Sequence, residues 1–376
     1  MSILAKVLWT AGRLLPINRK KIVLSCFYGR GCSDSPKAIA EALHRKDPTL
    51  KLICLTDKKH LDNLPEYVTP KSYHIFSRVY HLSTAKVWID NTRKGAGYKK
   101  KNQFYLQTWH GFALKRIEKD AAGGKELDRT YAEYAKRDSA QTDLYISGSQ
   151  HMTEIYKNSF WYQGPVAQTG TPRNDILFRK SDIIRKKVYK KLGLDECRKL
   201  ILYAPTFRAD HNTDCYRLDC AGVIAACEKR FGGEWTVLIR LHPSVDALSG
   251  GLFSYDSLNT VDATGYDDVM ELLCSTDLLI TDYSSVMFDF ALTGRPSLQF
   301  ATDLEAYKKD RNFYFPIETL PFPRAESNEQ LTAQIKAYDR AQAAEQWNDF
   351  SKKYGFCEDG KASERCADLI LSKIVK

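Results

Sequence analysis

The amino-acid sequence predicts an α/β protein made of two domains with parallel β-sheets. Short apolar runs alternate with longer segments of helical periodicity, which is the rhythm of βαβ units. The chain has 376 residues, more than one compact core usually needs. Polar or glycine-containing turns follow several apolar runs, as expected where parallel strands end. Periodicity, length and turn placement therefore agree on the fold class.

The composition is that of an ordinary globular protein. Hydrophobic residues make up 43% of the chain and charged residues 27%. No apolar run approaches the ~20 residues that a membrane-spanning helix requires. We therefore do not expect an integral membrane protein.

The ten cysteines show no CxxC pair and no Cys/His cluster with zinc spacing. Several of them sit in apolar strand-like runs, where a thiol behaves as a small hydrophobe. We expect reduced thiols, a cytosolic location and no metal site.

The N-terminal segment, residues 1–21, is an amphipathic and basic region. It carries an apolar helical face, and no acidic residue occurs in the chain before Asp34. Such a helix either lies on an anionic membrane surface or docks on the protein's own core. Trp9 and the basic cluster at 19–21 favour the lipid surface slightly.

Residues 22–178 are predicted to form the N-terminal domain. The periodicity predicts strands at 22–27, 50–56, 87–90, 104–108 and 143–147, with helices at 33–45 and 72–83. The turn-rich segment 168–175 ends this half of the chain.

Residues 179–350 are predicted to form the second domain. Strands are expected at 200–204, 236–241 and 278–280, with helices at 182–192, 221–229 and 267–275 and a polar helical region from 328 onward. The C-terminal residues 351–376 would form a helix that packs back on the first domain.

The segment 277–300 reads as a buried strand, a tight polar turn, a helix and the approach to another strand. Ser284 and Ser285 stand where the helix begins, so its unpaired N–H groups could bind a phosphate. The alternative is an ordinary strand-to-helix turn with a serine cap.

Two other strand ends carry polar groups that could join this turn. Thr206 and Arg208 follow the strand at 200–204, and His242 follows the strand at 236–241. In a parallel sheet these ends share one edge, which would make a cradle for a diphosphate. Asp282 and Asp289 could accept from ribose hydroxyls or orient the cradle, or simply cap the helix.

His110 is the candidate general base of the first domain. It follows the strand at 104–108, between Trp109 and Gly111. A histidine with a pKa near ~6.5 can accept a proton from a hydroxyl at neutral pH. Lys115 begins a basic stretch that could guide an anionic acceptor, or that could simply be a solvated surface.

Five motifs together resemble the CDP-glycerol:poly(glycerophosphate) glycerophosphotransferase family. They are WHG with a lysine four residues on (109–115), GTPRND (170–175), YAPTFR (203–208), RLHP (240–243) and LITDYSSVMFDF (279–290). The resemblance covers about residues 20–350 and keeps the family's order of motifs.

The resemblance implies a GT-B-like fold of two Rossmann-like domains with the active site in the cleft between them. Residues 22–178 would bind the acceptor, and residues 179–350 would bind the CDP-activated donor. It implies transfer of glycerol phosphate or ribitol phosphate from a CDP-alcohol to a lipid-linked saccharide or growing teichoic acid or capsule polymer, with release of CMP. No cofactor or metal is implied, and the location would be the inner face of the bacterial membrane.

The site residues follow from matching positions. The resemblance makes His110 and His242 catalytic, and it places Thr206, Arg208, Asp282, Ser284, Ser285 and Asp289 at the donor. The residues expected at the acceptor or in the cleft are Trp109, Gly111, Lys115, Arg173, Asn174 and Asp175.

Two departures from the family pattern leave the transferred group open. Phe112 and Ala113 follow WHG where the family usually has Thr-Pro, and Thr171 replaces a usual tyrosine. The rival hypotheses are a GT-B glycosyltransferase that uses a nucleotide sugar and a nucleotide-binding scaffold without turnover. The acceptor saccharide, single or repeated transfer and the oligomeric state stay open.

Overall fold

The computed structural model describes residues 3–61, 64–94, 97–122, 128–179, 182–208, 213–241, 253, 255, 259–310 and 312–374. The chain forms two compact units, which are described separately. Unit 1 contains residues 1–112, 117–175 and 355–376. Unit 2 contains residues 113–116 and 176–354.

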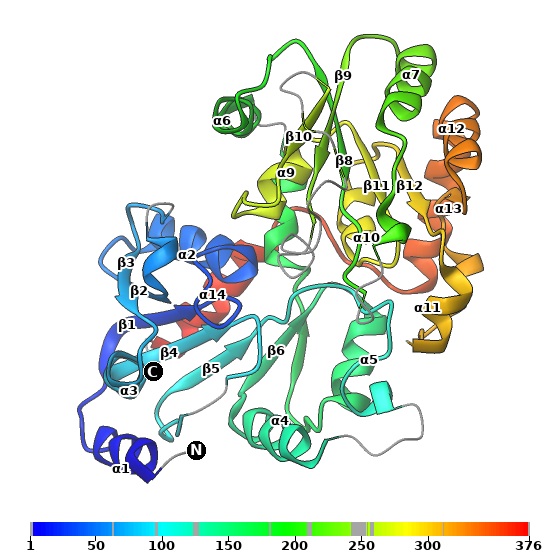
Figure 1. The fold of residues 1–376 in the computed structure, drawn as a ribbon. Coiled ribbons are helices and arrows are strands. Elements are labelled where there is room, and N and C mark those ends of the chain that lie inside the picture. The colour runs from blue at the N-terminus through cyan, green and yellow to red at the C-terminus, as the bar shows by residue number, and fades with distance from the viewer. Residues whose placement is uncertain are drawn as a thin grey trace. The chain divides into compact units, whose positions relative to one another are not determined.

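The centre of unit 1 is a parallel sheet with the order β3-β2-β1-β4-β5-β6-β7 in the described part of the chain (Figure 1). Its strands are β1 (Asn18–Ser25), β2 (Lys51–Thr56), β3 (Thr69–Ser72), β4 (Ala85–Asp90), β5 (Phe104–Gln107), β6 (Leu144–Ser147) and β7 (Val166–Gln168). The inner strands are apolar and buried, as expected for strands covered on both faces.

Helices cover both faces of this sheet. They are α1 (Ile3–Gly12), α2 (Asp34–Lys46), α3 (Ile75–Thr84), α4 (Arg129–Gln141), α5 (Gln150–Ser159) and α14 (Ala362–Ile374). Ile39 of α2 and Ile370 of α14 share one core cluster with Leu24. Trp9 of α1 and Leu82 of α3 belong to the cluster on the other face.

Unit 2 is built on a second parallel sheet, with the order β10-β9-β8-β11-β12-β13 among the described residues. Its strands are β8 (Lys199–Tyr203), β9 (Trp235–Ile239), β10 (Thr260–Asp262), β11 (Leu278–Thr281), β12 (Ser297–Phe300) and β13 (Arg324–Ala325). Its helices are α6 (Asp182–Leu192), α7 (Cys220–Phe231), α9 (Val269–Ser275), α10 (Val286–Ala291), α11 (Leu304–Asp310), α12 (Asn328–Lys336) and α13 (Arg340–Lys353).

Short 3₁₀ turns complete both units. They are η1 (Lys58–His60), η2 (Glu118–Ala122), η3 (Pro172–Phe178), η4 (Asp214–Tyr216) and η5 (Ile317–Thr319).

The predicted α/β class with two parallel sheets is confirmed. Each predicted strand is present, with ends that differ by a few residues. The sequence pattern missed β3, β7, β10 and β13, which are all short and lie at or next to sheet edges. All four residues of β3 are exposed. A strand that buries little apolar surface leaves no clear periodic pattern in the sequence.

The division into units differs in detail from the predicted domains. Unit 2 begins at Ile176, whereas the sequence placed the boundary after residue 178, and unit 1 resumes at Gly355. The C-terminal helix α14 belongs to unit 1, where Asp368 pairs with Lys46 of α2 at 2.6 Å. The segment 113–116 belongs to unit 2, which the sequence did not suggest.

The N-terminal helix α1 has one docked face and one exposed face. Trp9 is completely buried against the sheet and α3. Ile3, Leu4 and Val7 expose more than half of their surface, at 82%, 60% and 59%. Docking of α1 on the protein's own core therefore explains the buried Trp9, but it does not explain the apolar side chains on the exposed face of this helix.

All ten cysteines lie in the described part of the chain, and all are free thiols. A search of the described helices for one long and apolar enough to cross a bilayer found none.

Candidate functional site

His110 lies in the loop after β5 in unit 1, and its ring is held by the loop after β4. Its Nδ1 is 2.7 Å from the main-chain oxygen of Asn91. A carbonyl oxygen can only accept a hydrogen bond, so Nδ1 carries the proton when the ring is neutral. Nε2 then keeps its lone pair, which is the form that a general base requires.

Two aromatic rings fix the imidazole further. Trp109 stacks on His110 with ring centres 4.3 Å apart, and Phe27 meets it edge-on at 5.7 Å. Burial lowers the pKa of His110 below its usual value, while the hydrogen bond to Asn91 opposes that shift. The neutral form of the ring is therefore favoured at neutral pH.

The backbone of the Trp-His-Gly turn is unusual. Trp109 has φ of 53°, and its N–H donates to the Oε1 of Gln107 at 2.9 Å. Gly111 has φ of 144°, in the region where a side chain would be strained. The turn therefore explains why glycine follows the histidine.

Arg173, which lies in η3, holds this turn through its side chain. Its Nη1 donates to the main-chain oxygen of His110 and to Oδ2 of Asp34, both at 2.7 Å. The side chain is 6% exposed. In this structure Arg173 positions the histidine loop, whereas the sequence had suggested a contact with acceptor or cleft.

Asn174 and Asp175 also make internal contacts. The carboxylate of Asp175 accepts from the N–H groups of Ala362 and Ser363, at 3.0 and 2.7 Å, so it caps α14. Asn174 donates to Glu358 at 3.4 Å. Both residues are buried. Both oxygens of Asp175 accept hydrogen bonds in the helix cap, which is a structural role, and its predicted place at the acceptor or in the cleft stays a prediction.

A buried charged cluster lies next to the His110 loop. Arg93 donates to Glu118 at 2.9 Å and to Asp138 at 3.3 Å, and all three side chains are 1% exposed. Its guanidinium also packs on Phe160, whose ring meets Trp109 edge-on at 4.8 Å. Burial raises the pKa of Asp138 to about 6, against the opposing charge of Arg93. This cluster supports the loop that carries Asn91 and was not predicted from the sequence.

In unit 2, the ends of β8 and β11 meet as predicted. Asp282 accepts from the N–H and the hydroxyl of Thr206, at 2.9 and 2.7 Å, and from Nη2 of Arg208 at 2.8 Å. Asp282 therefore orients the other two side chains, one of the two roles considered for it.

Arg208 makes an extensive set of hydrogen bonds within unit 2. Its Nε and Nη2 donate to Asp303 at 2.6 and 3.0 Å, and its Nη1 donates to the main-chain oxygen and the hydroxyl of Thr206 at 2.7 and 2.9 Å. With the bond to Asp282, all of its N–H groups have acceptors within the protein. Arg208 therefore organises Thr206, Asp282 and Asp303 in this structure, and its predicted contact with the donor stays a prediction.

The serine turn lies directly after this cluster. Ser284 and Ser285 are half-buried, and Ser284 Oγ accepts only weakly from the N–H of Val286, at 3.4 Å. Asp289 is buried within α10. His242 lies outside the described residues, so its predicted catalytic role stays a prediction.

Lys115 belongs to unit 2, whereas His110 belongs to unit 1. Its Nζ donates to the hydroxyl of Tyr307 at 3.0 Å. Tyr307 stacks on Tyr283, with ring centres 4.0 Å apart. The acceptor-guiding role of Lys115 stays a prediction, and its hydrogen-bond partner lies in unit 2, where the sequence predicted the donor site.

Sequence reasoning missed four residues that hold the candidate site residues in place within unit 1 and within unit 2. Asn91 and Asp34 hold His110 and Arg173, while Asp303 and Tyr307 hold Arg208 and Lys115. Asn91 could have been found from the sequence, because it directly follows the end of β4, just as His110 lies shortly after the end of β5. Asp303 offered no local signal, since its partner is 95 residues away.

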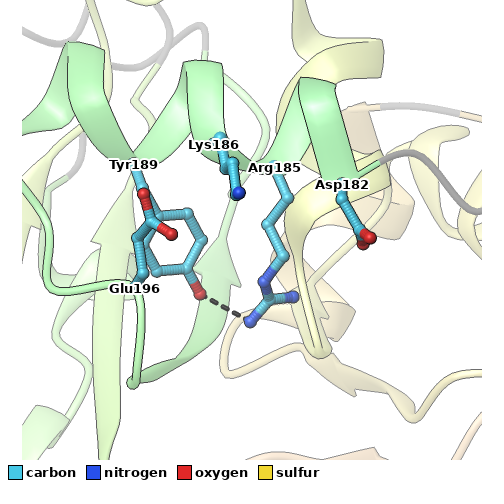
Figure 2. A pocket seen from close by; sticks show the side chains of 5 residues that line it. All are labelled: Asp182, Arg185, Lys186, Tyr189 and Glu196. Carbon is cyan, nitrogen blue, oxygen red and sulfur yellow. Dashed lines mark hydrogen bonds between the residues drawn. The ribbon is translucent and has the colours of Figure 1, made fainter.

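A separate hollow lies beside α6 (Figure 2). Asp182, Arg185, Lys186, Tyr189 and Glu196 line it. Arg185 bonds to Tyr189 at 2.5 Å and to Asp277 at 3.0 Å. The guanidinium of Arg185 therefore links α6 to the residue just before β11, which is a structural role.

Among the described residues, no group of three or more His, Cys, Asp or Glu side chains is arranged to hold a metal ion.

Comparison with known proteins identifies close relatives. The sequence profile of the CDP-glycerol:poly(glycerophosphate) glycerophosphotransferase family matches residues 8–372. The teichoic acid poly(glycerol phosphate) polymerase of Staphylococcus epidermidis is 32% identical over 94% of this chain, which spans 51% of that protein. The teichoic acid glycerol-phosphate transferase of Staphylococcus aureus is 32% identical over 94% of this chain and 93% of its own. The teichoic acid ribitol-phosphate primase of Bacillus spizizenii is 27% identical over 96% and 92%.

Solved structures agree with these matches. The wall teichoic acid polymerase TagF superposes with a TM-score of 0.83 at 30% identity, over 99% of this chain and 94% of that one. Staphylococcus aureus MnaA in complex with UDP has a TM-score of 0.52 at 14% identity, over 95% and 98%, and supports the fold alone. The expected GT-B-like class is confirmed. The chain spans about half the length of the first curated relatives it matches.

Proposed function

The chain belongs to the CDP-glycerol:poly(glycerophosphate) glycerophosphotransferase family, and from this membership we propose that it transfers a polyol phosphate from a CDP-alcohol to an acceptor hydroxyl. The observation that carries the proposal is the hydrogen bond of His110 to Asn91, because it leaves Nε2 unprotonated in the family's Trp-His-Gly motif. The relatives include both glycerol-phosphate and ribitol-phosphate enzymes, so glycerol and ribitol are both candidate polyols.

In the proposed reaction, Nε2 of His110 takes the proton of the acceptor hydroxyl. The acceptor oxygen attacks the phosphorus that carries the polyol, and the bond from that phosphorus to the bridging oxygen breaks. CMP leaves with this oxygen, and the polyol phosphate stays on the acceptor. The N–H groups of the turn at Ser284 and Ser285 would stabilise the negative charge that develops on the phosphoryl oxygens. We propose that no metal ion takes part.

The proposed acceptor is a lipid-linked saccharide or a growing polymer of the teichoic acid or capsule type. The proposed location is the inner face of the cell membrane, to which the protein would bind peripherally. An acceptor held at a bilayer would require the enzyme to work at that surface.

The proposed membrane-binding surface combines α1 with α3. Ile3, Leu4 and Val7 are exposed on α1, and Phe76 and Tyr80 are 56% and 54% exposed on α3. The two helices pack together over one face of the sheet. Exposed apolar side chains on adjacent helices are typical of an interfacial anchor.

Lysines border the same surface. Lys21 is 7% exposed, and its ammonium lies 4.7 Å from the ring centre of Tyr80. Burial, and then the charges of Lys51 and Lys71, lower the pKa of Lys21 to about 8. Lys51 and Lys71, whose charges act on Lys21, are exposed, and anionic lipid headgroups would offset their positive charge.

Replacing Ile3, Leu4 and Val7 together by serine should weaken binding to anionic vesicles by at least ~10-fold, because each buried apolar side chain contributes ~1.5–3 kcal/mol. These substitutions leave Trp9 in the core, whereas deletion of the whole segment would remove it. Cosedimentation with vesicles of phosphatidylglycerol measures the effect. Ile183→Ser is the matched control, since Ile183 is 83% exposed on α6. Unchanged binding by the triple variant would reject the surface.

The reaction itself is tested by CMP release. Purified protein is given CDP-glycerol or CDP-ribitol with a lipid-linked disaccharide and EDTA. We expect CMP release with one of the two donors, and we expect EDTA not to reduce it, because the phosphoryl charge is assigned to protein groups. Loss of activity in EDTA that added magnesium restores would contradict the metal-free proposal. No release, together with thermal stabilisation by a nucleotide sugar, would favour the glycosyltransferase alternative.

A further inference from the structure

Lys115 comes from the same sequence motif as His110, yet its backbone is built into unit 2. It forms an antiparallel bridge with Phe313. On either side, the N–H of Arg116 donates to the oxygen of Asn312 at 2.8 Å, and the N–H of Tyr314 donates to the oxygen of Leu114 at 3.0 Å. These paired bonds fix the direction of the Lys115 side chain within unit 2.

The ammonium group of Lys115 sits on an aromatic pair at the donor turn. It donates to the hydroxyl of Tyr307 and lies 5.5 Å from the centre of that ring. Tyr307 stacks on Tyr283, the residue directly before Ser284. Lys115 therefore lies at the end of the sheet where the serine turn begins.

Without Lys115, the charged cluster of Arg208, Asp282 and Asp303 has a net negative charge. Arg208 is the neighbouring cation, and it is bound to two carboxylates, Asp282 and Asp303. The hydroxyl of Tyr283 also donates to Asp303, at 3.0 Å. One positive and two negative charges leave this cluster with a net negative charge, which would repel a diphosphate.

Lys115 is placed to supply the missing positive charge. It is half-buried, and no carboxylate within the described ranges of the chain lies within ion-pair distance of its Nζ. Its hydrogen-bond partner is the hydroxyl of Tyr307, so no carboxylate of the described residues balances its charge. An ammonium group on a flexible stem is a common phosphate ligand.

We propose that Lys115 binds the diphosphate of the CDP-alcohol donor, and does not guide the acceptor. This inference rests on the proposed function. It assigns the phosphate-binding cation of unit 2 to Lys115 and leaves Arg208 to organise Thr206, Asp282 and Asp303.

The test is donor affinity without acceptor, measured by calorimetry with CDP as the probe. Lys115→Met keeps the apolar stem and removes the charge, and it should weaken CDP binding at least ~10-fold, as expected for loss of a charge-assisted contact. Its affinity should also depend less on salt. Lys115→Arg should recover part of the loss. Lys336→Met is the matched control, because Lys336 is exposed on α12 of the same unit.

The outcomes separate this inference from the proposed function. Unchanged CDP affinity in Lys115→Met, with a raised KM for the acceptor alone, would overturn the inference and return Lys115 to the acceptor. Failure of the unmodified protein to bind CDP, CDP-glycerol or CDP-ribitol would contradict the proposed function before any variant is compared. A melting temperature equal to that of the unmodified protein shows that the variant is folded.

Discussion

Replacing His110 by alanine should lower turnover by at least ~100-fold, the usual effect of removing a general base. CDP binding should change little, because the donor-binding residues that we assign lie in unit 2. The measurements are CMP release under saturating donor and calorimetry with CDP. Near wild-type turnover would show that another group takes the proton.

His44→Ala provides the matched control. His44 lies on α2, where its ring stacks on Tyr67 at 5.1 Å, away from the loops that hold His110. It should retain turnover. If both histidine variants lost activity equally, a loss of folding and not of the base would explain the result.

The pH dependence follows from the same assignment. The neutral imidazole is the active form, so the rate should rise with pH and level off above the pKa of His110. Because burial lowers that pKa, the rise should lie below pH ~6.5, the ordinary value for histidine. The rate should therefore already be level at neutral pH. A rise centred well above that value would contradict the buried environment of His110.

The sequence predicted the fold well because the fold depends on local patterns. Apolar runs such as 278–281 become inner strands, and their polar ends follow from parallel strands sharing one edge. The base candidate was found for the same reason, since His110 lies two residues after the run at 104–108. What the sequence could not supply was its tautomer, which depends on the backbone of Asn91.

Contacts with partners far away in the sequence could not be predicted. Asp175 appeared to belong to a ligand-binding turn, but it caps a helix that begins 187 residues later. Lys115 follows His110 closely in sequence, but its hydrogen-bond partner is 192 residues away. Neither periodicity nor motif spacing predicts such pairings, because they depend on the tertiary structure.

Arg208 gives the second large expected effect. Replacing it by methionine should lower the free energy of unfolding of unit 2 by ~3–5 kcal/mol, because it leaves the carboxylates of Asp282 and Asp303 without their cation. Urea denaturation without ligand measures this, and hydrogen exchange in β8 and β11 localises it. Arg217→Met is the matched control: the pair of Arg217 with Asp214 is exposed, so the change should be ~0–1 kcal/mol.

The Arg208 experiment also distinguishes an organising residue from a phosphate ligand. A ligand that served no structural purpose would leave stability unchanged when removed, and only CDP affinity would fall; that result would restore the role first predicted from the sequence. An organising residue should instead be partly rescued. Arg208→Met combined with Asp303→Asn removes one carboxylate charge along with the cation, so the double variant should be more stable than Arg208→Met alone. If it is not, the buried carboxylates are not the cause of the destabilisation.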